Sequence, residues 1–424
     1  MKKLMIVLLI AIVALSTVFA AAEAEKTTKK KLTIAAESWE ITKINLEWCV
    51  EQYKANHPDV EVELVTVADS GVLTNYILDW SKGNTDVDLV FLDGGLLAPS
   101  YAAKGLIYDF DKELNFFSDY PRSNFQPGTL DTGLVKGVQV CMPAIYEVYA
   151  ISLNKAMFKE AGLVDEKGEP LPINSWDDFY NFAEKLTKKD ASGNVTQIGA
   201  SIQFGNNLTS ILGAAIIAEY GDAYAADGFT YNVDTPEIKH MLELWQKGVL
   251  NEYITKATFT ENAGGRNAFK AGKVAMCYEA AGRWMEAIPT VGEENLALAA
   301  VPGKDGSAYC FGCQMVIPKA SKSADLACQF IKECVYAEET QVKAFQQYGK
   351  MSVISKYFVK ALDATPLWKS INKSMSTAKV LNPYDNHAEY LKGLQTIFQS
   401  GLVDPKTTAQ DMANAIIELT NSIK

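Results

Sequence analysis

The first hundred residues alternate between short apolar runs and longer stretches with apolar residues at helical spacing. Short apolar or alternating runs are typical of strands, whereas recurrence after three or four residues is typical of helices. A strand, helix, strand, helix, strand order requires each helix to cross over between parallel strands. We therefore predict a parallel α/β sheet, with strands at 32–36, 60–67 and 88–92 and helices at 41–53 and 72–80.

The chain begins a second unit of the same kind past Met142-Pro143. Ser175 precedes apolar residues at helical spacing, which predicts an N-capped helix. Because 424 residues exceed what one hydrophobic core usually serves, we expect two α/β lobes, formed by 27–142 with about 314–356 and by 143–313 with about 357–424. Further predicted strands cover 148–154, 195–202, 274–278, 296–301 and 310–317, and further helices cover 208–220, 235–247, 262–271, 324–336 and 409–423.

The N-terminus has the pattern of an export signal. Lys2 and Lys3 precede an apolar run at 4–15, and small residues follow up to Ala22. Such a run is too short for a spanning helix, so residues 1–22 are predicted to be a cleaved signal peptide, with an uncleaved anchor as the alternative. Because the first cysteine, Cys49, lies well beyond this run, we expect a soluble periplasmic protein without lipid attachment.

The net charge limits the partners of the protein. The chain carries −11 at neutral pH, and loss of residues 1–22, with two lysines and no acidic residue, brings the charge to −13. An acidic exported protein is a poor partner for nucleic acid or anionic lipid. We therefore expect neither as a partner.

The cysteines and histidines form no recognisable metal motif. Seven cysteines in an oxidising compartment leave at least one thiol unpaired. Cys310 and Cys313 form a CxxC pattern, but in a predicted strand their odd separation directs the side chains to opposite faces, which favours packing over a redox or metal pair. His57, His240 and His387 are not spaced with acids or cysteines like a zinc site. We expect no cofactor and no metal ion.

Several short segments carry a family resemblance in a constant order from about residue 32 to residue 330. The run Phe-Lys-Ala-Gly-Lys-Val-Ala-Met at 269–276 is followed by Gly282-Arg-Trp284, and Tyr53-Lys-Ala-Asn-His-Pro-Asp59 precedes a predicted strand. The further segments are 101–106, 152–155, 158–162, 175–179, 302–306, 311–318 and 324–330. Together they resemble the extracellular solute-binding proteins of family 1, the maltose-binding-protein-like carbohydrate receptors of ABC importers.

The resemblance implies a two-lobed periplasmic-binding-protein fold of type II, with a cleft at the hinge. It also implies a monomer that captures a sugar, closes about crossings near Pro143, Gln314 and Ser352, and then meets the membrane permease subunits of an ABC importer. The chain departs from the family pattern in three ways. Cys313 replaces a common glycine, 349–353 lacks a common proline, and the lipid-attachment cysteine of many relatives is missing.

The candidate ligand residues are of types that suit a sugar. A sugar has hydroxyl groups around its rim and apolar C–H faces, so it needs carboxylates, amides and flat aromatic rings. Ligands of parallel sheets bind beyond the carboxyl ends of the strands, where loops at 37–40 and 93–95 are expected. Asp93 ends a predicted strand before two glycines that allow close approach, with a helix N-cap as its alternative. In contrast, helical stripes predict core positions for Trp48, Trp80, Trp176 and Trp245.

The other candidates come from the resemblance. Trp284 matches an aromatic residue that stacks on sugar, with core packing as its alternative. Glu147, eight residues before Lys155, matches a sugar-binding glutamate, with a hinge salt bridge as its alternative. Arg283 is expected either at the cleft or in a surface salt bridge. The remaining candidates are Trp39 and Tyr146, for which core packing is again the alternative, and Glu40, Gln203, Phe204, Phe311, Gly312 and Tyr384, with His387 near the last.

Two other functions are compatible with the sequence. Abundant acidic residues allow the carboxylate pair of a secreted glycoside hydrolase, but no nucleophile-elbow, zinc or thiol–histidine pattern is present. The closer alternative is the same fold with a polyol, a sugar acid or a phosphate ester as ligand. An anion would need more basic residues than Arg283, the one placed at the cleft, so we expect a neutral sugar as the ligand. Because the catalytic patterns named above are missing, we expect no enzymatic activity.

Overall fold

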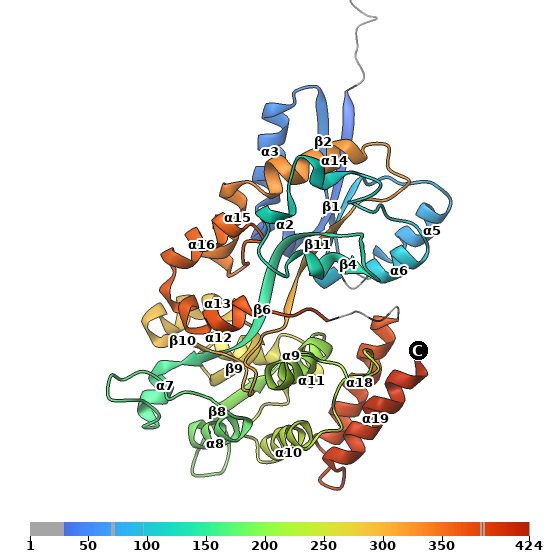
Figure 1. Ribbon diagram of the computed structural model, residues 1–424. Helices are drawn as coiled ribbons and strands as arrows, with labels where there is room; N and C mark the ends of the chain where they lie inside the picture. The colour runs from blue at the N-terminus through green and yellow to red at the C-terminus, as the bar shows by residue number, and fades with distance from the viewer. Residues whose placement is uncertain (1–28, 69–72, 96, 382–383, 385, 424) are drawn as a thin grey trace, which may run out of the picture.

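The computed structural model describes residues 29–68, 73–95, 97–381, 384 and 386–423, so the predicted signal peptide lies outside the described residues. Two lobes lie one above the other in Figure 1, with the N-terminal strands in the upper lobe and the C-terminal helices in the lower lobe. Each lobe combines strands of a large sheet with covering helices. The predicted two-lobed α/β fold is therefore confirmed.

The upper lobe is built on the predicted parallel sheet. β1 (Lys30–Glu37) pairs in parallel with both β2 (Val60–Val67) and β3 (Leu89–Leu92). Because parallel strands end at a common edge, the segments that follow them meet there, and this edge faces the lower lobe (Figure 1). The connecting helices are α2 (Ser38–Lys43), α3 (Leu46–Asn56), α5 (Tyr76–Ser81) and α6 (Ala98–Ala103).

The segment after β1 differs from the sequence-based expectation. A loop is predicted at 37–40, but α2 begins directly at Ser38. Glu37 and Glu40 form a capping box, in which the Glu37 backbone N–H donates to Glu40 Oε2 at 2.8 Å. These reciprocal hydrogen bonds satisfy the helix N-terminus at once, so the prediction of a loop is wrong and Trp39 projects from a helix.

One long strand joins the two lobes. β6 (Met142–Asn154) is buried along its whole length and begins earlier than the predicted strand at 148–154. Its first half pairs with β11 (Cys310–Val316), and its second half pairs with β9 (Val274–Ala280) and β10 (Leu296–Ala299). Since β11 also pairs with β3, the lobes share a nine-stranded sheet in the order β2-β1-β3-β11-β6-β9-β8-β7, with β10 on β6.

The lower lobe covers the other end of this sheet with helices. β8 (Val195–Ile202) pairs in parallel with β9 and antiparallel with β7 (Lys188–Lys189). Ser175 caps α8 (Trp176–Leu186) as predicted, because its hydroxyl accepts from the Asp178 N–H at 3.1 Å. The remaining helices, of which α14, α15 and α16 lie in the upper lobe (Figure 1), are α7 (Lys155–Glu160), α9 (Leu208–Tyr220), α10 (Pro236–Leu250), α11 (Ala257–Thr260), α12 (Gly264–Lys270), α13 (Arg283–Val291), α14 (Ala324–Phe330), α15 (Glu338–Tyr348), α16 (Ser355–Ala364), α17 (Asn372–Ser376), α18 (His387–Gly401) and α19 (Ala409–Ser422).

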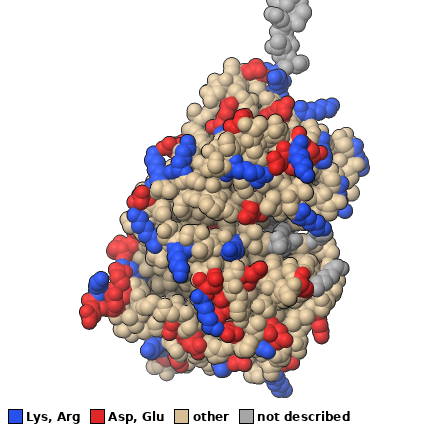
Figure 2. All heavy atoms as spheres, viewed as in Figure 1, with Lys and Arg blue, Asp and Glu red and all other residues tan. Residues whose placement is uncertain are grey.

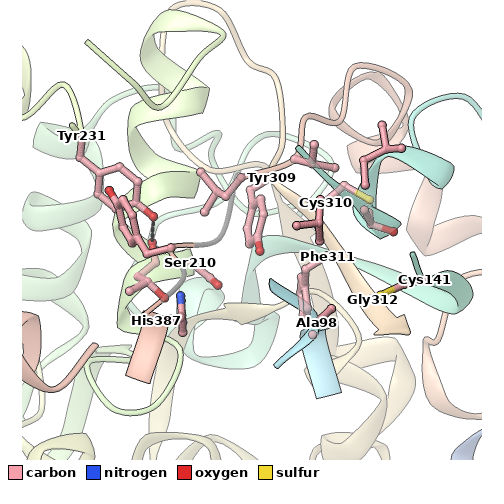
Figure 3. A pocket seen from close by; sticks show the side chains of 17 residues that line it. Ala98, Cys141, Ser210, Tyr231, Tyr309, Cys310, Phe311, Gly312 and His387 are labelled. Carbon is pink, nitrogen blue, oxygen red and sulfur yellow. Dashed lines mark hydrogen bonds between the residues drawn. The ribbon is translucent and has the colours of Figure 1, made fainter. Parts of the chain in front are cut away.

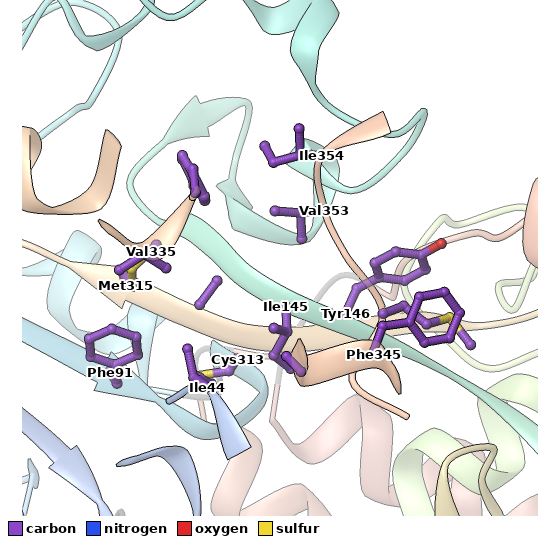
Figure 4. Packing of buried hydrophobic residues seen from close by; sticks show 14 of the residues in the cluster. Ile44, Phe91, Ile145, Tyr146, Cys313, Met315, Val335, Phe345, Val353 and Ile354 are labelled. Atoms are coloured by element: carbon purple, nitrogen blue, oxygen red, sulfur yellow. The ribbon is translucent and has the colours of Figure 1, made fainter. Parts of the chain in front are cut away.

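The hydrophobic core is continuous through the hinge. Ile145 on β6 and Cys313 and Met315 on β11 belong to one buried cluster, which Figure 4 shows, and this cluster extends to Phe345 on α15. A second cluster forms the core of the lower lobe around β8 and β9. Of the four tryptophans predicted in the core, three are buried, whereas Trp48 is partly exposed; the buried residues are Trp80, Trp176 and Trp245.

All seven cysteines lie in the described part of the chain as buried free thiols. The Cys313 thiol donates to Glu40 Oε1 at 3.1 Å, whereas Cys310 lines a cavity between the lobes. The two thiols of the CxxC pattern therefore have different surroundings. This arrangement agrees with the prediction that they are packing residues of a strand.

Candidate ligand-binding cleft

A small cavity lies between the two lobes. Its volume is about 40 Å³. The space-filling view shows the furrow that separates the lobes on the face seen in Figure 1 (Figure 2). The cavity is lined from the upper lobe by Gly94, Ala98, Thr132, Leu134, Val135 and Cys141, and from β11 and the lower lobe by Thr209, Ser210, Tyr231, Tyr309, Cys310, Phe311, Gly312, Val380, Leu381, Tyr384 and His387 (Figure 3).

Stacked aromatic rings form one wall of this cavity. Tyr309 and Phe311 line it with ring centroids 5.8 Å apart at an interplanar angle of 20°, and the buried Tyr149 ring packs behind them, 5.6 Å from Tyr309 and 5.0 Å from Phe311. Tyr309 and Phe311 alternate along the same chain segment and therefore share a face of the sheet. Burial raises the pKa of the Tyr149 and Tyr309 phenols, which keeps both neutral. We call these three rings, together with Tyr231 and His387, the aromatic end of the cleft.

A buried ion pair lies next to the aromatic end. Glu147 stands opposite Phe311 in the sheet and pairs with the Lys350 ammonium, and both charged side chains are almost completely buried. Burial lowers the pKa of Lys350, although Glu147 acts in the opposite direction. The Lys350 Nζ atom also lies 5.1 Å from the Trp39 ring centroid. Glu147 thus takes part in a hinge salt bridge, which is the alternative given for it above.

A chain of further ion pairs continues from this point. Arg283 Nε lies 2.9 Å from Glu279 Oε1, and Arg283 Nη1 lies 2.7 Å from Glu286 Oε1. Arg266 also pairs with Glu279. Lys43 Nζ lies 2.9 Å from Glu286 Oε1 and connects α2 of the upper lobe with α13 of the lower lobe. We call these side chains, together with Glu147 and Lys350, the charged end of the cleft.

The carboxylates and cations of the charged end stabilise each other. Although burial acts in the opposite direction, Arg283 and Lys43 hold the pKa of Glu286 well below its usual range. Burial alone would lower the pKa of Arg283, but the neighbouring carboxylates of Glu279 and Glu147 raise it. Glu286 and Arg283 are therefore ionised at neutral pH. Each cation of the charged end has a carboxylate partner.

Asp93 connects the two ends of the cleft. It is the first residue of the 3₁₀ turn η1 (Asp93–Gly95), beside the cavity, and its side chain is exposed. Although part of the residue is exposed, desolvation by the surrounding protein raises the pKa of its carboxyl, and Glu147 adds to the rise, whereas Lys350 and the two arginines of the charged end act against it. The Asp93 carboxyl is therefore close enough to the charged end for the two to interact electrostatically.

Glu40 is a carboxyl of a different kind, because it is fully buried. Burial raises its pKa to about 8, although the Glu37 N–H and the Cys313 thiol donate hydrogen bonds to it. A side chain in this environment faces the protein and not the cleft. Its role as a ligand contact remains a prediction.

Three of the candidate ligand residues are packed in the core, and the side-chain amide of a fourth forms a hydrogen bond within the protein. Trp284 is fully buried and lies edge-on to Trp368, with ring centroids 5.9 Å apart. It projects inward because α13 begins at the preceding residue. The structure therefore places Trp284 in the core, which is the alternative given for it above. Phe204 and Tyr146 are also buried, and the Gln203 amide donates to Asn262 O at 2.6 Å.

Other candidates do lie together at the cleft. Phe311, Gly312 and Tyr384 line the cavity, although the Tyr384 hydroxyl donates to the Phe229 carbonyl. A side chain at Gly312 would meet Ile145 O, so glycine is required for this close approach of strands. Trp39, Asp93, Glu147 and Arg283 lie at or beside the charged end.

Several charged residues of the cleft were not predicted from the sequence. Arg266, Glu279 and Lys43 lie in helices and strands whose apolar patterns give no sign of ion pairing. Lys350 falls within the segment 349–353 that lacks a proline common in the family, which was the one signal available for it. The partners of Lys43 and Lys350 are 243 and 203 residues away in the sequence, so periodicity could not identify them. Glu279, in contrast, lies four residues before Arg283 and 13 residues after Arg266, which was a local signal that the prediction did not use.

Two kinds of feature are absent from the described residues. No helix among them is both long and apolar enough to cross a membrane. The same residues contain no group of three or more His, Cys, Asp or Glu side chains that could hold a metal ion.

Solved structures with the same fold include three sugar complexes. An ABC substrate-binding protein from Listeria monocytogenes in complex with cycloalternan has a TM-score of 0.75 and 17% identity, over 93% of this chain and 99% of that chain. Maltose-bound MalE3 of T. maritima has a TM-score of 0.75 and 19% identity, over 93% and 100%. The GacH receptor of Streptomyces glaucescens, solved unliganded and with acarbose, has a TM-score of 0.73 and 19% identity, over 93% and 100%.

The sequence itself matches a protein family. A comparison with curated protein sequences gives no match. The family of bacterial extracellular solute-binding proteins, in contrast, matches residues 48–369, which is well over half of the chain. The chain therefore belongs to the bacterial extracellular solute-binding protein family.

Proposed function

We propose that this protein captures a neutral sugar between its lobes and delivers it to an ABC importer. The observation that carries the proposal is the interlobe cavity with the stacked rings of Tyr309 and Phe311 on one wall and an array of ion-paired carboxylates and guanidinium groups beside it. Aromatic faces cover the C–H faces of a sugar, and paired charged groups donate to and accept from its hydroxyls. Similar structures contain cycloalternan, maltose and acarbose.

The charges of the cleft favour a neutral ligand. Lys350 is paired with Glu147, and Arg266 and Arg283 are paired with Glu279. An anionic ligand would have to compete with these buried carboxylates for the same cations. A hydroxyl group, in contrast, can accept from a guanidinium and donate to a carboxylate without breaking the pair.

The size of the cavity supports hinge closure as the mechanism. Small-molecule sites commonly measure about 300–1,000 Å³, far more than the volume of about 40 Å³ here. The lobes must therefore separate to admit a sugar and close on it afterwards. We propose 27–142 with about 314–356, and 143–313 with about 357–424, as the two moving units, with crossings near Pro143, Gln314 and Ser352.

The same proposal covers where the protein acts. The family is one of extracellular binding proteins. We propose that residues 1–22 are removed on export and that a monomeric protein without a lipid anchor acts in the periplasm. There its closed form would meet the importer's permease subunits. The protein would bind and release its sugar without chemical conversion.

A thermal-shift panel tests the proposal. Maltose, mannobiose, mannotriose, tagatose and acarbose are suitable probes, because solved structures of the same fold contain them. A sugar at 100 times its dissociation constant stabilises the folded protein by about 2.7 kcal/mol. Absence of any shift across mono-, di- and oligosaccharides would contradict sugar binding.

Two further measurements assign the binding to the cleft. Phe311→Leu should weaken binding of the stabilising sugar about tenfold, because it removes an aromatic face worth about 1.3 kcal/mol. Phe117→Leu, which alters a similarly half-buried ring away from the cavity, is the matched control. Small-angle scattering should show a smaller radius of gyration with sugar, and an unchanged radius at saturation would refute hinge closure.

A further inference from the structure

His387 contributes an imidazole to the interlobe cavity. It is the first residue of α18, and its ring lies at the cavity together with Ser210 and Tyr309 (Figure 3). Ser210 and Thr209 come from the first turn of α9, where the Tyr231 hydroxyl donates to Thr209 O at 3.1 Å. Hydrogen-bonding groups from two helices therefore converge on the same side of the cavity.

The Nδ1 atom of His387 is buried and has no hydrogen-bond partner among the described residues. The other two histidines of the chain differ in this respect. His57 Nε2 lies 2.8 Å from Glu333 Oε2, and His240 Nε2 lies 3.0 Å from Asp177 Oδ2. Buried polar atoms in native proteins nearly always have a partner, so an exception at a cavity wall needs an explanation.

The protonation state of His387 restricts what this partner can be. Burial lowers the pKa of the imidazole to about 4, and the positive end of the α18 dipole also disfavours the charged ring. A neutral imidazole has one N–H donor and one lone-pair acceptor. A hydroxyl group can serve either nitrogen, whereas a carboxylate or a phosphate could accept from only one of them.

We propose that His387 is a specificity-determining residue, whose unpartnered nitrogen forms a hydrogen bond with a hydroxyl group of the sugar when the lobes close. The inference rests on the proposed function and deepens it. Ser210, whose hydroxyl lies near the phenols of Tyr149 and Tyr309, provides a second polar group on the same wall. The ring stack covers the face of the sugar, and His387 selects among sugars by the position of a hydroxyl.

Nitrogen-15 NMR of histidine side chains tests this directly, because the chain has three histidines and therefore three sets of ring signals. His57→Gln and His240→Gln assign two of the three sets. The probe is the member of the maltose, mannobiose, mannotriose, tagatose and acarbose panel that raises the melting temperature most. Saturation with this sugar should shift the His387 ring nitrogens and leave those of His57 and His240 unchanged.

Affinity measurements on variants supply the second readout. His387→Phe keeps a planar ring without nitrogen and should weaken binding of the same sugar about tenfold, whereas His387→Gln keeps a donor and an acceptor and should stay within about threefold. His240→Gln, with an altered surface histidine, should bind like the wild type. The ranking of sugars should change in His387→Phe, which general loosening of the fold would not produce.

The outcomes separate the inference from the function on which it rests. A sugar that stabilises the protein without shifting the His387 signals, or with equal affinity for His387→Phe, overturns the role of His387 and leaves sugar binding intact. If no sugar of the panel stabilises the protein, the proposed function fails and the inference fails with it.

Discussion

The two ends of the cleft solve different physical problems. At the charged end, each cation is held by a carboxylate of the same chain, and the ion pairs extend from the hinge to both lobes. At the aromatic end, ring faces border the cavity and the His387 Nδ1 has no partner among the described residues. At the charged end, the charged groups mainly bind one another, whereas at the aromatic end ring faces and an unpartnered nitrogen remain available to a ligand. Stability should therefore depend mainly on the charged end and ligand selectivity mainly on the aromatic end.

The largest effect on this comparison is expected from Glu147→Ala. The substitution leaves the Lys350 ammonium buried without its carboxylate, and such a loss costs about 3–5 kcal/mol of unfolding free energy. Urea denaturation measures it. The double variant Glu147→Leu with Lys350→Leu removes both charges and should recover most of the loss.

A surface ion pair provides the matched control for that experiment. Lys31 and Glu63 also form a close pair, at 2.8 Å, but about half of each side chain is exposed. Glu63→Ala should therefore change the unfolding free energy by less than about 1 kcal/mol. Equal losses in Glu147→Ala and Glu63→Ala would show that the charged end has no special importance for stability.

Two tryptophans sharpen the same comparison at a smaller scale. Trp284→Leu should cost about 2–3 kcal/mol of unfolding free energy, because it opens a cavity next to Trp368. Trp39→Leu alters a partly exposed ring beside Lys350, so it should cost less than about 1 kcal/mol and weaken sugar binding instead. Calorimetry and binding measurements on both variants separate the effects. A loss of binding without a loss of stability in Trp284→Leu would show that Trp284 stacks on the sugar and does not serve the core.

The fold was predictable from the sequence where local patterns determine it. The alternation of apolar runs predicted a parallel sheet, because the side-chain period differs between strands and helices, and β1 does pair in parallel with β2 and β3. The cap at Ser175 was also predicted, since the residues that form it are neighbours in the chain. The helix at Ser38–Lys43 was missed because its capping box uses two glutamates instead of a Ser, Thr, Asp or Asn cap.

The candidate site was less predictable because its contacts are long-range. Glu147 was singled out, but its partner Lys350 is 203 residues away in the sequence. Trp284 was expected at the cleft, yet the start of α13 at Arg283 turns the indole into the core. Residue type and spacing indicate which side chains could bind a sugar, whereas tertiary packing decides which way each side chain points.

Glu40→Gln should produce a pH-dependent effect of intermediate size. The pKa of Glu40 is raised to about 8 in the folded protein, mainly by burial, from an ordinary value of 4.5. Between these values the folded state binds a proton that the unfolded state does not, so this group makes stability fall as pH rises. Glutamine does not ionise, so the gain of the variant over the wild type should be small at pH 4.5 and should grow steadily as the pH rises to 8. Guanidinium denaturation across this range would contradict the prediction if the difference were constant.

The smallest effect is expected at the ion pair that links the lobes. Lys43→Met removes the contact between α2 and Glu286 on α13, and because both side chains remain partly exposed the loss should be about 0.5–1 kcal/mol and should shrink with added salt. Lys270→Met is the matched control, since Lys270 contacts the same carboxylate at 3.4 Å from α12 of the same lobe. If the charged end also holds the lobes together, small-angle scattering without sugar should show a larger radius for Lys43→Met and an unchanged radius for Lys270→Met. Equal radii would mean that this end stabilises each lobe without influencing how far they open.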